Sequence, residues 1–511
     1  MRVLLAKQQG DKSISIAILG ESGRGKTQFA LNYYYSSQQY SHCYWFDASS
    51  EEQLQMQFIV VGTEAKLSFG EMNVIEKIKL VKKYLESHKK ALIIFDNAVS
   101  QEILKDFMPQ RQAHILITSL SLDSWTEAMK MLPLEEEEAR KLVLKYFQHD
   151  FKPMIQELKK QFSLSPLGLF HAAARRVEEE IAEEAYLQEI SFLKRAQPDR
   201  DFAYYAVKLR LRSLASKFPK EYQLLQLISI FELSTIPLIV FTEENKEVLR
   251  ELEKKGFIVI NDEKKTLFCH AIINQVVFQA FEAEKAMLRQ IASLGLMNLN
   301  NYFNQHPRDS SLIYLVYLKK ITTLIEKEKF IQYVDRAALI SLYIKLANIL
   351  GFKLNSVESV AMAERSVSLA QAGEVSDKLK LDAVQTLMQV CWETGNMNRG
   401  FEESKKVLFF CQARAGDEFF KKKLAHAKHN TALFYRKIGD LSFSRQLLEE
   451  AIELLGTLTD EGEEAVKNKK NQALGKIILG FFVAESKDYD TALLIIKEAE
   501  NILEPVVPNL K

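Results

Sequence analysis

Short apolar runs alternate with helical segments through the first part of the chain. The apolar runs predict strands at residues 14–19, 43–47, 91–96, 114–119 and 129–134, and helical periodicity between them predicts helices at 28–35, 51–67 and 74–87. Continuous apolar strands separated by helices are typical of a parallel sheet that helices cover on both faces. The pattern therefore predicts an α/β domain at residues 1–135.

Helical periodicity dominates the rest of the chain. We expect a small helical domain at residues 136–200 and a helical linker at 286–335. Between them, at residues 201–285, helices flank two β-prone runs, 257–260 and 266–269, whose polar connection predicts a hairpin. Helices that surround a single hairpin are typical of a winged-helix domain.

The last part of the chain, residues 336–511, repeats one kind of turn. The hexapeptides that begin at Gly395, Gly439 and Lys487 share the pattern G-[DN]-hydrophobic-x-x-small of a tetratricopeptide hairpin, with lysine replacing the glycine in the third. Their starts are 44 and 48 residues apart, against about 34 in the standard repeat. We therefore expect an all-α array of long helical hairpins, with a further unit around residues 360–370.

Composition and charge narrow the classes of protein. The 68 basic and 67 acidic side chains leave a net charge of +1, so the chain as a whole has no basic footprint for nucleic acid or for an anionic membrane. Four cysteines lie far apart without metal-ligand spacing, which suits a reducing compartment. No apolar stretch reaches the length that spans a bilayer. These features predict a cytoplasmic multidomain protein, and they leave open export through a signal read on the folded chain.

The strand at 14–19 leads into a glycine-rich loop that carries the first chemistry. The loop spells G-x-x-x-x-G-K-T, in which the glycines let backbone N–H groups surround phosphate oxygens, Lys26 neutralises the outer phosphates and the Thr27 hydroxyl is a ligand of Mg²⁺. We therefore expect a nucleoside di- or triphosphate with Mg²⁺ at this loop. The nucleotide-binding residues predicted here are Gly20, Glu21, Ser22, Gly23, Arg24, Gly25, Lys26, Thr27 and Gln28.

A carboxylate follows at the end of the strand 91–96. Asp96 is expected to be a catalytic residue whose carboxylate holds Mg²⁺ through its water shell, because P-loop proteins place such a carboxylate at a neighbouring strand end. The next residue is Asn97, whose amide cannot accept a proton from an attacking water. The sequence therefore predicts that any ATP hydrolysis is slow.

The order of these motifs resembles the NB-ARC class of signal-transducing (STAND) ATPases, and within it the bacterial-type proteins with C-terminal tetratricopeptide repeats. The resemblance rests on residues 20–30, similar to G-x-G-G-x-G-K-T-x-x-A, on the aromatic strand 44–48, and on Asp-Asn-Ala at 96–98, and it extends over nearly the whole chain. It implies a P-loop sheet, a small helical domain, a winged helix and a repeat superhelix, with ADP or ATP as the ligand.

Three further positions take their meaning from this resemblance. Pro166 resembles the helix start that packs on the nucleotide, and His270, directly after the hairpin, resembles the histidine that contacts the β-phosphate of ADP. Each has a structural alternative, since proline is common at the first position of a helix and a lone histidine is often a core residue. Leu120 departs from the pattern, because it stands where the family has an arginine near the γ-phosphate.

Two functions fit these features. In the first, the protein is a switch: ADP holds the α/β, helical and winged-helix modules together, ATP opens them to form a homo-oligomer, and the repeats bind a protein or peptide partner. In the second, it is a tetratricopeptide scaffold whose nucleotide is permanent, which Asn97 and Leu120 favour. A DNA-binding regulator has little support, because the hairpin turn mixes Glu263 with Lys265 and the net charge is near zero.

Overall fold

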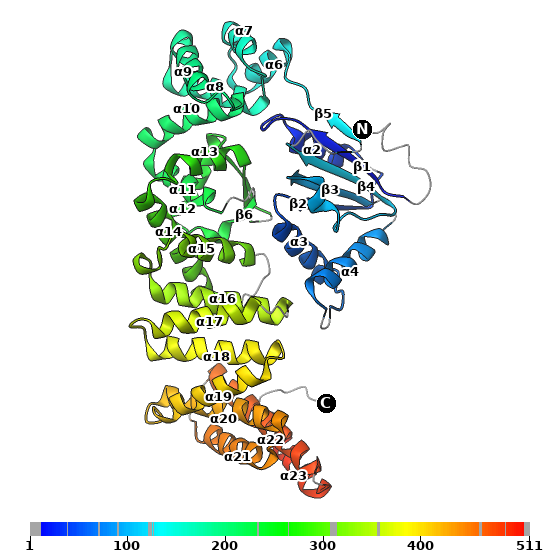
Figure 1. Ribbon diagram of the computed structural model, residues 1–511, viewed down its shortest axis with the longest axis vertical. Coiled ribbons are helices and arrows are strands. Elements are labelled where there is room, and N and C mark those ends of the chain that lie inside the picture. Colours follow the sequence, from blue (N-terminus) through cyan, green and yellow to red (C-terminus); the bar gives the residue numbers. More distant parts are fainter. Residues whose placement is uncertain are drawn as a thin grey trace. The chain divides into compact units, whose positions relative to one another are not determined.

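The computed structural model describes residues 12–504, except for 38, 70–71, 89–90, 121–124, 126, 232–234, 264, 307–313, 355–357, 459–461 and 486. The chain divides into two compact units, Met1–Asp335 and Arg336–Lys511. The first unit holds all of the strands in the described residues, and the second is helical throughout its described part (Figure 1).

A five-stranded parallel sheet forms the core of the N-terminal module (Figure 1). Its strands are β1 (Ile14–Leu19), β2 (His42–Asp47), β3 (Ala91–Ala98), β4 (Ala113–Ser119) and β5 (Ala128–Lys130), in the order β2-β3-β4-β1-β5. Apolar side chains of the sheet pack on one face against α2 (Lys26–Ser36), and on the other against α3 (Glu51–Glu64) and α4 (Val74–Glu86), with the short α5 (Gln101–Leu104) after β3. The predicted α/β class, with helices on both faces, is confirmed.

The last strand is shorter than predicted. β5 ends at Lys130, whereas the apolar run predicted a strand to residue 134. Pro133 has no N–H to donate to a strand ladder, and the backbone N–H of Leu134 donates instead to the carbonyl of Leu164, at 3.1 Å. The chain therefore leaves the sheet here and contacts the following helical module.

Helices and one small sheet complete the first unit. The first helices are α6 (Glu136–Phe147), α7 (Lys152–Gln161), α8 (Pro166–Glu179) and α9 (Glu183–Ala196). They are followed by α10 (Phe202–Lys217), α11 (Pro219–Ser229), β6 (Thr235–Pro237), η1 (Leu238–Val240), α12 (Asn245–Lys254), β7 (Ile258–Asn261), β8 (Thr266–Cys269) and α13 (Ala271–Phe281), and then by α14 (Lys285–Gln305), α15 (Leu315–Lys327) and η3 (Ile331–Tyr333). The predicted hairpin is confirmed as the antiparallel pair β7–β8, and β6 adds a third antiparallel strand on the other side of β8.

The second unit is a series of helical hairpins. Its helices are α16 (Arg336–Leu354), α17 (Glu358–Gln371), α18 (Asp377–Glu393), α19 (Met397–Gln412), α20 (Glu418–Ile438), α21 (Leu441–Gly456), α22 (Gly462–Glu485) and α23 (Tyr489–Leu503). Each helix packs on the next one along the chain. This is the all-α repeat architecture that the sequence predicted.

The repeated turns have a common backbone conformation. Gly395, Gly439 and Lys487 all have a left-handed φ, of 76°, 91° and 65°, at the turns before α19, α21 and α23. The small residue of the second repeat, Ser444, is buried and donates its hydroxyl to the carbonyl of Ala432 at 2.6 Å. The long spacing between repeats follows from helices of 14 to 24 residues. A glycine is favoured at such a turn because a left-handed φ strains other residues.

A fragment of residues 336–511 is expected to fold on its own, because stacked hairpins bury their apolar faces against neighbours in the same unit. Far-ultraviolet circular dichroism should show a helical spectrum and a cooperative thermal transition. A control fragment of residues 336–456 lacks the α22–α23 hairpin that packs on α21, and it should melt at a lower temperature. A random-coil spectrum of the longer fragment would contradict this expectation.

Candidate functional site

The glycine-rich loop connects the end of β1 with the start of α2. Gly23 and Gly25 adopt left-handed φ angles of 70° and 90°, which a residue with a side chain rarely takes. Gly25 is the N-cap of α2, so the backbone N–H groups of the first helical turn point into the loop. The positive end of the helix dipole and these N–H groups favour an anion at this position.

Lys26 lies over the loop with most of its side chain buried. Its Nζ donates to the carbonyls of Gly20 at 2.7 Å and of Glu21 at 2.9 Å, and the residue is only 9% exposed. Burial lowers the pKa of Lys26 to about 8, although the nearby carboxylates of Asp96 and Asp201 act to raise it. The amine is therefore a poorly hydrated cation at the place where phosphate oxygens would bind.

Two hydroxyls surround the carboxylate of Asp96, which is 4% exposed. Thr27 Oγ1 donates to both carboxylate oxygens, at 2.9 and 3.1 Å, and Thr118 Oγ1 also donates to the carboxylate. Burial raises the pKa of Asp96, and the two hydroxyl groups oppose this shift. The hydroxyl of Thr27 and the carboxylate of Asp96 are hard oxygen ligands side by side, so they fit Mg²⁺. The sequence analysis missed Thr118 as a partner of Asp96, because Thr118 lies on the next strand, β4, after the segment that contains α5.

The strand end after Asp96 is irregular. Asn97 has a left-handed φ of 62°, and the pairing of β3 with β4 shifts register between Phe95 and Ala98. The backbone N–H of Asn97 donates to Thr118 Oγ1 at 2.9 Å, so this hydroxyl accepts from Asn97 while it donates to Asp96. Leu120, directly after β4, is 62% exposed. Asn97 therefore lies next to the Asp96 carboxylate without contributing an acidic group, as its sequence position predicted.

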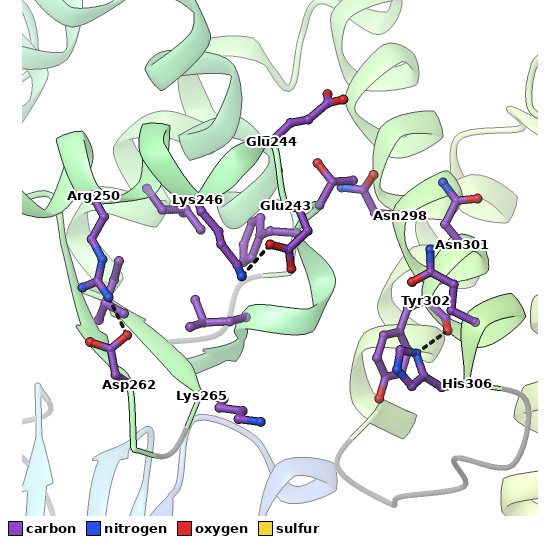
Figure 2. Close-up of a pocket in the computed structure, with 16 residues that line it drawn as sticks. Glu243, Glu244, Lys246, Arg250, Asp262, Lys265, Asn298, Asn301, Tyr302 and His306 are labelled. Atoms are coloured by element: carbon purple, nitrogen blue, oxygen red, sulfur yellow. Dashed lines mark hydrogen bonds and ion pairs between the residues drawn. The ribbon is translucent and has the colours of Figure 1, made fainter.

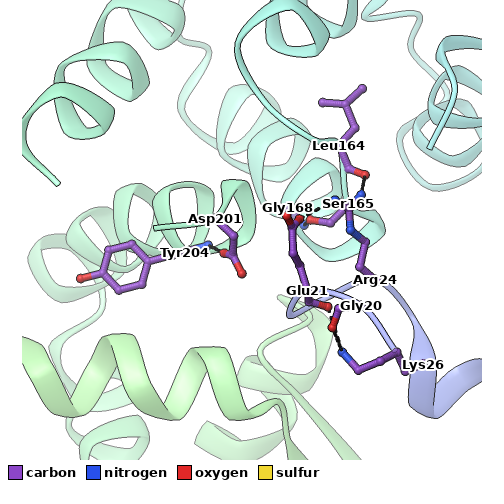
Figure 3. Close-up of polar contacts among 9 residues, drawn as sticks. All are labelled: Gly20, Glu21, Arg24, Lys26, Leu164, Ser165, Gly168, Asp201 and Tyr204. Atoms are coloured by element: carbon purple, nitrogen blue, oxygen red, sulfur yellow. Dashed lines mark hydrogen bonds and ion pairs between the residues drawn. The ribbon is translucent and has the colours of Figure 1, made fainter. Parts of the chain in front are cut away.

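The loop is bound directly to the helical module (Figure 3). The guanidinium of Arg24 donates to the carbonyl of Leu164 and pairs with Glu21. The backbone N–H of Leu167 donates to the carbonyl of Gly23 at 3.3 Å. A Cβ on Gly23 would lie 2.8 Å from the Cβ of Leu167. The side chain of Arg24 thus holds the loop against the start of α8, while its backbone N–H belongs to the predicted anion site.

Pro166 is the first residue of α8, and its neighbour Ser165 caps the helix by accepting from the N–H of Gly168 at 3.3 Å. Pro166 therefore has the structural role of a proline at the first position of a helix. The same helix start contacts the loop through Leu167, so Pro166 also lies next to the predicted nucleotide site. Of the remaining predicted residues, Ser22 is half-buried in the loop, while Glu21 and Gln28 are exposed.

His270 caps α13 and lies near Lys26. Its Nδ1 accepts a hydrogen bond from the backbone N–H of Ile272 at 3.2 Å. Burial, and after it the positive charge of Lys26, lower the pKa of His270 to about 4. A neutral imidazole whose Nδ1 is an acceptor carries its proton on Nε2. His270 therefore fulfils the structural role of a helix cap and carries its ring proton on Nε2, within range of the charge of Lys26.

Acidification is expected to destabilise the first unit through His270. Its pKa is about 6.5 when the chain is unfolded and about 4 when folded, so the unfolded chain binds more protons between these values. The free energy of unfolding should fall as the pH decreases below about 6.5, by on the order of 3 kcal/mol at most. Urea titrations at pH 7 and pH 5 measure this loss. His270→Ser should show a smaller loss, and an equal loss in both proteins would contradict the assignment.

Asp201 is a carboxylate near the loop that the sequence analysis did not select. It is the N-cap of α10, where its Oδ1 accepts from the N–H of Tyr204 at 2.9 Å (Figure 3). Burial raises the pKa of Asp201, and the charges of Glu21, Arg24 and Lys26 also act on it. The only sequence signal was an aspartate before a helical segment, which indicates a helix cap. That Asp201 comes near Lys26 depends on how the helical module packs against the α/β module, which the local sequence does not indicate.

The charges near the hairpin do not form a basic surface. A cavity of about 900 Å³ lies between α12, the hairpin and α14 (Figure 2). In it Lys246 pairs with Glu243 at 2.6 Å, and Arg250 pairs with Asp262 at 2.5 Å. Paired charges of both signs offer no electrostatic attraction for a phosphate backbone. Within the described parts of the chain, no helix is both long enough and apolar enough to cross a membrane.

The fold and the loop define a P-loop α/β protein with a winged-helix-like module and a C-terminal array of helical hairpins. No protein-family model and no curated protein matches this chain. Its similarities are to solved structures.

A Signal Transduction ATPase with Numerous Domains (STAND) protein with a tetratricopeptide repeat sensor, from Pyrococcus horikoshii, is similar over 99% of this chain and 83% of its own, with 16% identity and a TM-score of 0.43. BtubC from P. vanneervenii covers 46% of this chain and 87% of its own, with 13% identity and a TM-score of 0.32. A putative kinesin light chain with TPR-like repeats, from Podosopora anserina, covers 43% and 98%, with 16% identity and a TM-score of 0.31. The first of these structures bears the name of the class that the motifs of this chain resemble.

Proposed function

We propose that this chain is a nucleotide-dependent switch that binds ADP or ATP with Mg²⁺ and hydrolyses ATP slowly. The observation that carries the proposal is that groups from three modules surround one loop. Leu164 and Leu167 of the helical module bind Arg24 and Gly23, while His270, at the start of α13, lies close enough to Lys26 to feel its charge. A ligand at this loop would touch all three modules.

A switch requires that ADP and ATP make different contacts with the modules, and the groups around the loop can provide this difference. The loop N–H groups and Lys26 bind the phosphates from the α/β module, and the Nε2–H of His270 donates to the same phosphates from the winged-helix module. A diphosphate bound between Lys26 and His270 would hold the modules in one arrangement. A third phosphate adds charge and volume next to Asp96, so ATP is expected to favour a different arrangement. Mg²⁺, held by Thr27 and Asp96, would screen the phosphate charge.

The helical repeats are the proposed partner-binding part. Arrays of helical hairpins present continuous surfaces that bind proteins or peptides. We propose that a protein or peptide partner binds the second unit and that the ATP state forms a homo-oligomer in the cytoplasm.

The nucleotide content of the purified protein tests the switch. After extensive dialysis, chromatography of the denatured protein should show ADP that exchanges for added labelled nucleotide. The mass of the protein should increase with a non-hydrolysable ATP analogue and remain that of a monomer with ADP. Permanent ADP with no change of mass would favour the scaffold alternative, and absence of any nucleotide binding would reject both.

His270→Ala is expected to weaken ADP binding by about 1 to 3 kcal/mol, because it removes one donor to a buried phosphate. Since His270 also caps α13, the matched variant is His270→Ser, which restores a capping side chain and not the imidazole donor. Calorimetry should give the same weakened affinity for both variants. Wild-type affinity in His270→Ser would show that the histidine acts only as a helix cap.

A further inference from the structure

A second carboxylate lies beside Asp96 on the same face of the sheet. In the parallel register of β2 and β3, Asp47 is the partner of Asp96, and neighbouring strands are about 4.8 Å apart. Two residues earlier, Trp45 and Ile94 pack in the cluster on the α2 face. Because side chains alternate along a strand, Asp47 and Asp96 are directed to that face too. The charge of Asp47 acts on Asp96, which agrees with this placement.

A cavity with room for water adjoins this carboxylate. It has a volume of about 380 Å³, and its wall on the α/β module consists of Asp47, Ser49 and Asn97. Residues of α13 form much of the opposite wall, among them Gln275. One water needs on the order of 15 Å³ and two to four polar partners, so several waters fit here. The cavity thus places water next to the strand end that carries the predicted Mg²⁺ ligand.

The backbone around Asp47 is fixed by specific hydrogen bonds. Gln57 Oε1 accepts from the N–H of Asp47, and Gln57 Nε2 donates to its carbonyl, both at 3.0 Å. The N–H of Ser49 donates to Asp47 Oδ1, also at 3.0 Å. An ionised carboxylate has about four acceptor sites, so hydrogen bonds to protein groups and to a water can coexist on it. The carboxylate is therefore held in position and keeps the capacity to act as a base.

We propose that Asp47 is the general base for ATP hydrolysis at this site, an inference that rests on the proposed nucleotide binding. The water oxygen bonds to the γ-phosphorus, the bond from that phosphorus to the β–γ bridging oxygen breaks, and its electron pair leaves with ADP. The water proton moves to the Asp47 carboxylate and is later released to solvent, so the products are ADP, inorganic phosphate and one proton. Of the residues at the ends of β2 and β3, Asp96 accepts hydrogen bonds from Thr27 and Thr118 and Asn97 is an amide, whereas Asp47 offers a carboxylate to the cavity.

Asp47→Asn tests the base in the full-length protein. Single-turnover hydrolysis of radiolabelled ATP should slow by about 10²- to 10⁴-fold, the usual contribution of a general base. The affinity for a fluorescent ADP should stay within about twofold, since Asp47 ends β2 and does not belong to the loop that is expected to hold the diphosphate. Asp47→Glu retains a carboxylate and should keep most of the rate. The matched control is Asp106→Asn, an exposed aspartate of the same module, which should hydrolyse at the wild-type rate.

A second change separates proton transfer from a merely structural role. Adding Asn97→Asp to Asp47→Asn places a carboxylate in the wall of the same cavity, and it should recover at least about tenfold of the lost rate. Asp47→Asn hydrolysing at the wild-type rate, or a wild type that binds ATP and never cleaves it, would overturn the inference and leave the switch standing. A wild type that binds no nucleotide would remove the proposed function together with it.

Discussion

Lys26→Ala is expected to reduce the affinity for ADP and ATP by at least about 10²-fold. A hydrogen bond to a charged group contributes about 1.5 to 3 kcal/mol, and the lysine is expected to make more than one to the phosphates. Each of these hydrogen bonds should be strong, because the buried amine has little water to lose when a phosphate binds. Burial also lowers the pKa of Lys26 to about 8. Calorimetry with ADP and Mg²⁺ at pH 7 measures the loss.

The fold should tolerate this change. The two carbonyls that Lys26 Nζ contacts belong to Gly20, which is buried, and to Glu21, which is exposed. The truncated side chain leaves room for water to reach both carbonyls in place of the amine. The circular dichroism spectrum of Lys26→Ala should equal that of the wild type. The control is Lys79→Ala, an exposed lysine on α4, which should bind nucleotide normally. Normal affinity in Lys26→Ala would reject the loop as the nucleotide site.

Local patterns were sufficient to predict the elements of the fold. The apolar runs of β1, β3 and β4 are buried on both faces, and this produces the continuous hydrophobic signal of a parallel sheet. The repeated turns at Gly395 and Gly439 were recognisable because a left-handed backbone favours glycine. The end of the last strand was predicted wrongly. Pro133 has no N–H for strand pairing, and the backbone N–H of Leu134 donates to the carbonyl of Leu164 in the helical module.

The site was predictable only where its residues are close in sequence. Gly20 to Thr27 form one loop, so their geometry follows from a short motif. The hydroxyl of Thr118 reaches Asp96 from another strand, and Asp201 approaches Lys26 from another module. Such contacts depend on strand order and on module packing, which a local pattern does not encode. For the same reason the sequence analysis treated Asp47 only as part of an aromatic strand. The strand register places Asp47 beside Asp96, the predicted Mg²⁺ ligand, and this pairing cannot be recognised from a local pattern.

ATP turnover by the wild-type protein is expected to be far slower than about one per second, the low end of typical enzyme rates. Asp47 is the proposed base, but the position directly after β4 is Leu120, where the family that this chain resembles has an arginine. A missing electrostatic contact to the transition state typically costs about 10²- to 10³-fold, and the loss of an arginine at the γ-phosphate can cost more.

Leu120→Arg should therefore raise the rate of phosphate release, by up to about 10²-fold. Leu120 is exposed at the end of a buried strand, so a longer side chain meets no core and the fold should be unchanged. Leu120→Gln is the matched control, because it adds a polar side chain without charge and should leave the rate near that of the wild type. Equal rates in all three proteins, or a wild-type rate already like that of ordinary ATPases, would show that the γ-phosphate is stabilised by groups other than those at the end of β4.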